Sequence, residues 1–132
     1  LVIGTQATIA SGVYQDILEQ KHIAFSVFCP TLLAGNIEFG DIQAIRTDII
    51  QILMYANQMK VSSILYACTH YPLVDDIFKE EVIKHELSIR FIDPAKYVAA
   101  QVQKWNLTGG KITLYETSKE TDIFKKYKRL EV

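Results

Sequence analysis

Residues 63–73 read Ser-Ile-Leu-Tyr-Ala-Cys-Thr-His-Tyr-Pro-Leu, and this stretch decides the fold of the chain. Its first five residues form a short apolar run, which is typical of a strand buried on both faces of a sheet. Cys68, Thr69 and His70 follow directly. Pro72 fits the first turn of a helix, where the missing backbone N–H has no partner to lose. The stretch therefore predicts a strand, a turn with polar side chains, and a helix.

The same alternation of strand and helix extends along the chain. Short β-branched runs predict further strands at residues 1–4, 23–28, 88–92 and 111–115. Apolar side chains spaced three and four residues apart predict helices at residues 9–21, 41–59 (with Asp41 as N-cap), 72–84, 94–105 and 121–129. This alternation indicates an α/β fold, a parallel sheet flanked by helices. In such sheets ligands bind beyond the carboxyl ends of the strands, so the residues after each strand are the candidates for a site.

Composition and charge describe a globular chain of 132 residues with 14 Lys and Arg, 15 Asp and Glu, and a net charge of −1. A nearly neutral chain has no electrostatic footprint for nucleic acid or for an anionic membrane. The apolar runs are too short to span a bilayer, and two cysteines are too few for a disulfide framework. We therefore expect a reduced, cytoplasmic protein that binds neither nucleic acid nor membrane.

Cys68, Thr69 and His70 form the strongest candidate site. A thiol reacts as its thiolate, and both a helix N-terminus and a nearby imidazole favour the ionised form. Thr69 adds a hydroxyl and a backbone N–H at a strand-to-helix turn, which suit a carboxylate ligand. The alternative is an inert cysteine at the end of a buried strand, because most core cysteines have no chemical role.

A second candidate site follows the first predicted strand, in the run Gly4-Thr5-Gln6-Ala7-Thr8-Ile9-Ala10-Ser11. Hydroxyls at three-residue spacing near a helix start can bind an anion together with backbone N–H groups. The alternative is plain helix capping by Thr8 or Ser11. The run lacks the glycine pattern of a nucleotide-binding loop.

Glu38 is expected in a loop at the same edge of the sheet. There it could orient an imidazole, and the alternative is a solvated carboxylate. Metal binding is not expected, because Cys29, Cys68, His70 and His85 lack the spacing of a zinc site.

Three of these segments together resemble the glutamate racemase type within the aspartate/glutamate racemase family. The runs that carry the resemblance are Gly4 to Ser11, Cys29-Pro30, and Ala67-Cys68-Thr69-His70-Tyr71-Pro72-Leu73. Asp93-Pro94-Ala95 and Tyr115-Glu116-Thr117-Ser118 look like the closing elements of the family. The likeness covers nearly the whole chain in order and corresponds to the C-terminal portion of the family. In that family the Glu after Cys-Pro falls one residue earlier than Glu38 does here.

The resemblance implies a cofactor-independent isomerase that interconverts L- and D-glutamate and supplies D-glutamate for peptidoglycan. Cys68 would be one of two opposed catalytic thiols, and His70 would assist it. The amino-acid site would be lined by Thr5, Thr8 and Thr69, with Glu38 as an auxiliary residue. A base on one face of the α-carbon and an acid on the other invert the stereocentre, and a thiolate and a thiol exchange these roles with the handedness of the substrate.

The resemblance also implies that part of the enzyme is missing. The chain opens without Met on an apolar run, so we expect further polypeptide upstream. Residues 1–93 would form the second α/β lobe, and residues 94–132 would return to the absent first lobe. The implied partners are a small amino acid and the missing N-terminal half with its own catalytic thiol, with a homodimer as a further option. The chain alone would then be inactive. The alternatives are an aspartate or hydantoin racemase, and a non-catalytic remnant or binding domain.

Overall fold

A four-stranded parallel sheet forms the centre of the molecule in the computed structural model, which describes residues 1–105. The strands are β1 (Val2–Gly4), β2 (Val27–Phe28), β3 (Ser63–Ala67) and β4 (Arg90–Ile92), in the order β2-β1-β3-β4. Every neighbouring pair is parallel. The predicted α/β class is therefore confirmed. The predicted strand at 111–115 and helix at 121–129 lie outside the described residues.

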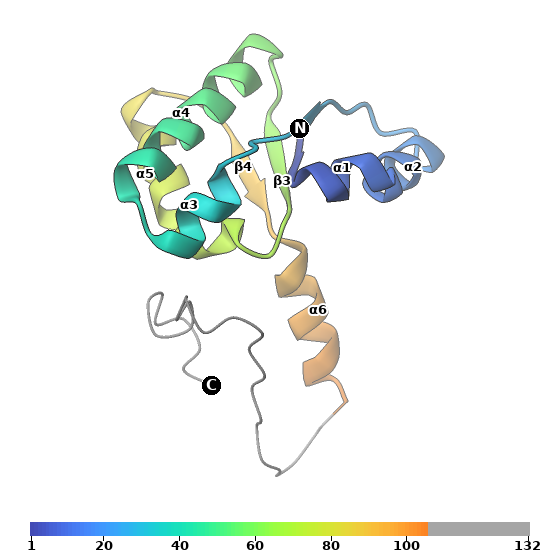
Figure 1. Ribbon diagram of the computed structural model, residues 1–132. Helices are drawn as coiled ribbons and strands as arrows, with labels where there is room; N and C mark the ends of the chain where they lie inside the picture. The colour runs from blue at the N-terminus through green and yellow to red at the C-terminus, as the bar shows by residue number, and fades with distance from the viewer. Residues whose placement is uncertain (106–132) are drawn as a thin grey trace.

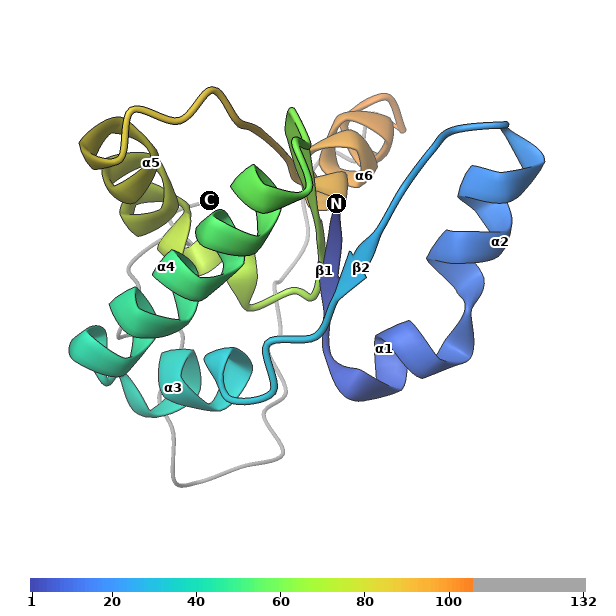
Figure 2. The same cartoon turned by 90° about the horizontal axis from the view of Figure 1, so that it is seen from above.

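Helices lie on both sides of this sheet. On one side are α3 (Leu33–Phe39), α4 (Ile42–Gln58) and α5 (Asp75–Lys84), and on the other are α1 (Gln6–Ser11) and α2 (Val13–Gln20) (Figure 2). The last described helix, α6 (Pro94–Gln103), leaves the end of β4 and extends away from the body of the molecule (Figure 1). Within residues 1–105, no helix combines the length and the apolar character that a bilayer crossing requires.

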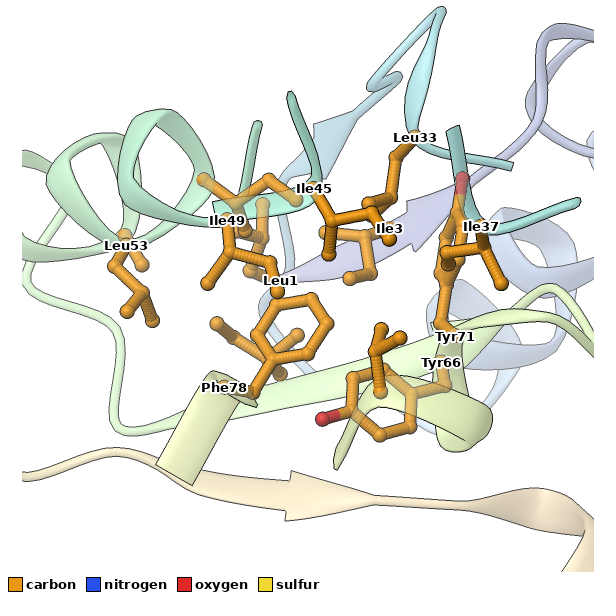
Figure 3. Packing of buried hydrophobic residues seen from close by; sticks show 14 residues of the cluster. Leu1, Ile3, Leu33, Ile37, Ile45, Ile49, Leu53, Tyr66, Tyr71 and Phe78 are labelled. Carbon is orange, nitrogen blue, oxygen red and sulfur yellow. The ribbon is translucent and has the colours of Figure 1, made fainter. Parts of the chain in front are cut away.

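The hydrophobic core fills the side of the sheet that faces α3, α4 and α5 (Figure 3). Ile3 and Tyr66 project into it from β1 and β3, and Phe78 of α5 packs on Tyr66 with ring centroids 5.2 Å apart. The apolar stripe predicted for residues 41–59 supplies the fully buried face of α4: Ile45, Ile49, Ile52, Leu53 and Ala56. Asp41 caps this helix as predicted, because its side chain accepts a 3.0 Å hydrogen bond from the backbone N–H of Ala44.

An ion pair joins α4 to α5 at the edge of the core. Arg46 donates to Glu81 at 2.7 Å and to Glu80 at 2.6 Å. The Glu81 side chain is only 1% exposed. A buried carboxylate needs charged partners to offset its lost hydration, so this pair fixes how the two helices meet.

The opposite face of the sheet is covered less completely. Neither α1 nor α2 contributes a buried residue. Strand β4 lies at the sheet edge, where Arg90 is exposed and Phe91 and Ile92 are only half-buried. The expectation that the strands are buried on both faces is met by β1, whose three residues are all buried. The same expectation was wrong for β4, which contains no buried residue.

The helix predicted at residues 9–21 is two helices instead of one. Gly12 separates α1 from α2 in the left-handed conformation, with φ at 72°, and its N–H bonds to the carbonyl of Ile9. The sequence pattern did not predict this break. A single left-handed residue changes the direction of the chain, but the three- and four-residue spacing of the apolar side chains continues across it.

Three other predicted elements have different bounds in the structure. The strand expected at 23–28 is ordered as β2 only over its last two residues, and the strand expected at 88–92 begins at Arg90. The helix expected at 72–84 starts as a 3₁₀ turn, η1 (Tyr71–Val74), before α5 begins. The loop expected around Glu38 was wrong, because residues 33–39 form α3.

We predict opposite effects of the same substitution at two glycines. Gly12→Ala should lower the free energy of unfolding by about 1–2 kcal/mol, because a side chain disfavours the positive φ of Gly12. Gly35→Ala should raise it by about 0.5–1 kcal/mol, because Gly35 lies inside α3 and an added Cβ would meet nothing within 4 Å. Urea unfolding of both variants measures the difference, and effects of equal sign would contradict the assigned conformation of Gly12.

Candidate active site

The adjacent parallel strands β2, β1 and β3 end side by side, so their carboxyl ends form one edge of the sheet. The register pairs Gly4 at the end of β1 with Ala67 at the end of β3. A Cβ added to Gly4 would lie 3.3 Å from the carbonyl oxygen of Ala67, so the two strand ends are already in close contact. Thr5, Cys29 and Cys68 are the residues that follow these ends. The fold thus brings the predicted site segments to one edge.

His70 lies between a thiol and a carboxylate. Its Nδ1 is 3.8 Å from the Sγ of Cys68, and its Nε2 is 2.7 Å from the Oε2 of Glu38. All three side chains are half-buried. Glu38 reaches the imidazole from α3, 32 residues earlier in the chain. The structure therefore places the three residues in a single line of contacts, and each ring nitrogen of His70 has one partner in it.

The turn that carries Cys68 and His70 is held by its own backbone and by one buried side chain. The N–H of Tyr71 bonds to the carbonyl of Cys68 at 3.3 Å, and the N–H of Leu73 bonds to that of His70 at 3.0 Å. The Tyr71 side chain is fully buried and stands beside Ile37 of α3 (Figure 3). Tyr71 thus anchors the turn in the core, whereas Thr69 is exposed and His70 is half-buried.

The charge of His70 follows from its two neighbours. The hydrogen bond to Cys68 raises the pKa of His70, burial opposes this, and Glu38 raises it further, to about 9. The imidazole is consequently cationic at neutral pH. A cationic imidazole beside a sulfur is the environment that activates catalytic cysteines in general.

Thr5 and Thr8 form a hydroxyl pair at the end of β1. Their Oγ1 atoms are 3.0 Å apart, and the N–H of Thr8 donates to Thr5 Oγ1 at 3.3 Å. Thr5 is therefore the N-cap of α1, in place of the Thr8 or Ser11 considered from the sequence. Thr69 is exposed in the neighbouring turn. These hydroxyls lie on the two strand ends whose contact was described above.

Tyr71 was not singled out from the sequence. Its hydroxyl is buried and has no hydrogen-bond partner among the described residues. Burial raises the pKa of Tyr71 above its ordinary value, and the nearby Cys68, Cys29 and Asp48 add to the effect. The sequence offered one indication of its role: Tyr71 lies between His70 and Pro72, directly after the predicted site residues. Within residues 1–105, no three His, Cys, Asp or Glu side chains gather as a metal site.

Comparison with known proteins finds relatives that share one name. The chain is 31% identical to the glutamate racemase of Aquifex aeolicus, a match that covers 92% of this chain and 48% of that protein. It is 35% identical to the glutamate racemase of Persephonella marina over 80% of this chain and 40% of that protein. It is 26% identical to the glutamate racemase of Carboxydothermus hydrogenoformans, over 92% of this chain and 49% of that protein.

The chain thus spans about half the length of the curated relatives it matches. No protein-family model matches it. The likeness therefore rests on these pairwise matches, each of which covers most of the present chain.

We predict that both neighbours of His70 support its raised pKa. Cys68→Ala should lower the pKa of His70 most, and Glu38→Gln should lower it less, in the order of their contributions. A ¹H–¹⁵N or ¹H–¹³C NMR titration of the His70 ring from pH 5 to pH 10 measures both shifts. A His70 pKa that is unchanged in both variants would contradict the line of contacts.

The same shift links stability to pH. Because the pKa of His70 in the folded chain lies above its ordinary 6.5, the stabilisation from protonated His70 is complete below about pH 6.5 and is lost as pH rises through about 9. Glu38→Gln should therefore cost more stability at pH 6 than at pH 10. Urea unfolding at the two pH values measures this difference.

Proposed function

Because the chain is homologous to glutamate racemases over most of its length, we propose that it forms one part of a glutamate racemase. The contact of the Cys68 sulfur with His70 at the open edge of the sheet is the observation that supports the proposal most. A fully buried cysteine facing away from His70 would fit an inert structural residue. The half-buried position of Cys68 fits a reacting one.

In the proposed mechanism Cys68 acts on one face of the substrate α-carbon. As a thiolate it accepts the α-proton, and the C–H electron pair remains on the α-carbon as a carbanion. A thiol on the opposite face then donates a proton to the inverted carbon and becomes the thiolate. The reverse reaction returns both groups to their first state. His70, held by Glu38, would stabilise the negative sulfur by its positive charge.

The threonine hydroxyls would bind the substrate. The Thr5 and Thr8 pair and the exposed Thr69 offer hydroxyl groups on two adjacent strand ends. Hydroxyl and backbone N–H donors at such ends suit a carboxylate, and glutamate carries two. No cofactor enters this scheme, because the two thiols supply both the base and the acid.

The second thiol would come from the part of the relatives that this chain does not match. Residues 1–93 would form one lobe, and the segment from residue 94 to 132 would pack on the other lobe. Helix α6 supports this assignment, because it contributes no buried residue and exposes Val98 and Val102 by 63% and 37%. Val98 and Val102 are one helical turn apart and form a short apolar stripe on α6. In the cytoplasm the assembled enzyme would supply D-glutamate for peptidoglycan.

We predict that the chain alone does not racemise glutamate. The purified chain with D-glutamate should show no sustained change in circular dichroism. Addition of the unmatched part of the Aquifex aeolicus relative, separate or fused, should start turnover and exchange the α-proton with solvent deuterium. Cys68→Ala should reduce this turnover by roughly 10²–10⁴-fold, the usual contribution of a positioned acid–base group.

Cys29→Ala is the matched control, because Cys29 is the other half-buried cysteine and lies after β2, which β1 separates from β3. It should retain turnover. Sustained turnover by the chain alone that depends on Cys68 would refute the need for a second half. Equal activity of the Cys68→Ala variant would refute the catalytic thiol, and preference for aspartate over glutamate would change the proposed substrate.

We also predict that the stripe on α6 is needed for assembly. Val98→Glu should weaken reconstitution with the other half by about tenfold or more, because a charge would enter an apolar interface. Gln103→Glu adds the same charge about 140° around α6 from Val98 and should have little effect. Titration of the complementing half against each variant, with turnover as the readout, measures the apparent affinity. Equal affinity of the two variants would exclude the stripe from the interface.

A further inference from the structure

The helix that carries Glu38 is short and is held on one side by a single pair of polar side chains. The Nδ2 of Asn36 in α3 donates to the Oδ2 of Asp48 in α4 at 2.8 Å, and both side chains are half-buried. The start of α3 has no side-chain cap, because Leu32 occupies the N-cap position. Phe39 is 71% exposed, so the outer side of α3 faces solvent. Besides the buried Leu33 and Ile37, the side-chain bond from Asn36 to α4 therefore constrains how α3 is turned.

The geometry of a helix connects this bond to the active site. Successive residues of an α-helix are rotated by about 100°, so Asn36 and Glu38 project about 200° apart. Ile37 lies between them, is fully buried, and faces the core beside Tyr71 (Figure 3). Rotation of α3 about this buried contact would move Asn36 away from α4 and, at the same time, move Glu38 relative to His70. The Asn36–Asp48 and Glu38–His70 contacts thus lie on opposite sides of α3, and a rotation of the helix would change both.

The backbone makes Asn36 the centre of this arrangement. Its carbonyl accepts hydrogen bonds from the N–H groups of Gly40 at 2.8 Å and Asp41 at 3.1 Å, which form the turn into α4. Its side chain makes the bond to Asp48. The residue consequently ties α3 to α4 by both main chain and side chain, two residues before Glu38.

We propose that Asp48, through its hydrogen bond to Asn36, is a positioning residue that keeps Glu38 in contact with His70. Asp48 touches neither His70 nor Cys68 by any hydrogen bond or ion pair of the described residues, so it acts through α3. Its catalytic consequence rests on the proposed racemase function. The structural part, the placement of Glu38 on the imidazole, is independent of any activity.

The test separates the hydrogen bond of Asp48 from its charge. Asp48→Ala removes both, whereas Asp48→Asn removes the charge and keeps an oxygen that can accept from Asn36. The readout is the pKa of the His70 ring, measured by NMR titration in each variant. Asp48→Ala should lower this pKa toward the value found in Glu38→Gln, and Asp48→Asn should leave it close to the unmodified chain. Asn36→Ala, which removes the donor, should match Asp48→Ala.

The background variant Glu38→Gln provides the decisive control. Once Glu38 carries no charge, Asp48→Ala should produce no further change in the pKa of His70. The reason is that α3 then holds no carboxylate whose position could affect the imidazole. Equal falls with Asp48→Ala and Asp48→Asn would assign the effect to charge alone and overturn the proposal. A fall of the same size in the Glu38→Gln background would also overturn it. Urea unfolding of each variant verifies that the compared chains are folded.

Turnover of the reconstituted enzyme distinguishes failure of this proposal from failure of the proposed function. Asp48→Ala should lower kcat by about the same factor as Glu38→Gln with little change in KM, and Asp48→Asn should restore it. A lowered His70 pKa without any racemase activity in the unmodified assembly would uphold the positioning role and refute the function. Normal kcat and an unchanged His70 pKa in Asp48→Ala, together with an active, Cys68-dependent assembly whose kcat falls in Glu38→Gln, would refute the positioning role and uphold the function.

Discussion

Parallel pairing of β1 with β3 determines where the segments that carry Thr5 and Cys68 lie. Because the strands run in the same direction and Gly4 is level with Ala67, the residues that follow them emerge together at one edge. The missing side chain of Gly4 permits the close approach of the two ends. A shift of one residue in this register would turn either Ile3 or Tyr66 out of the core, so the packing of the core also maintains the geometry of the site.

The core and the site are connected again through η1 and α3. Tyr71 anchors the turn after β3 from within the core, while Ile37 beside it anchors α3. Each buried residue lies next to a polar one at the sheet edge, His70 in the first case and Glu38 in the second. The imidazole and the carboxylate therefore meet because their apolar neighbours pack together. The raised pKa of His70 depends first on Cys68 within the short Cys-Thr-His run and then on Glu38, which tertiary packing brings to the ring.

The described part of the chain has one well-packed side and one side that is less covered. The core joins the sheet to α3, α4 and α5, and the ion pair of Arg46 with Glu81 closes its edge. On the other side α1 and α2 bury no residue, and α6, which extends away from the sheet, buries none either. This asymmetry is in keeping with a chain that spans about half the length of its relatives.

The sequence by itself determined the α/β class, the parallel sheet and the helix at 41–59 with its Asp41 cap, because periodicity and capping are local properties. It also identified Cys68 and His70 as neighbours, since only Thr69 separates them. Only the tertiary structure decided that Glu38 lies on a helix and reaches His70 from 32 residues away. It likewise decided the break at Gly12 and the exposure of β4. These depend on one backbone angle and on which elements cover an edge, and residue spacing carries no record of either.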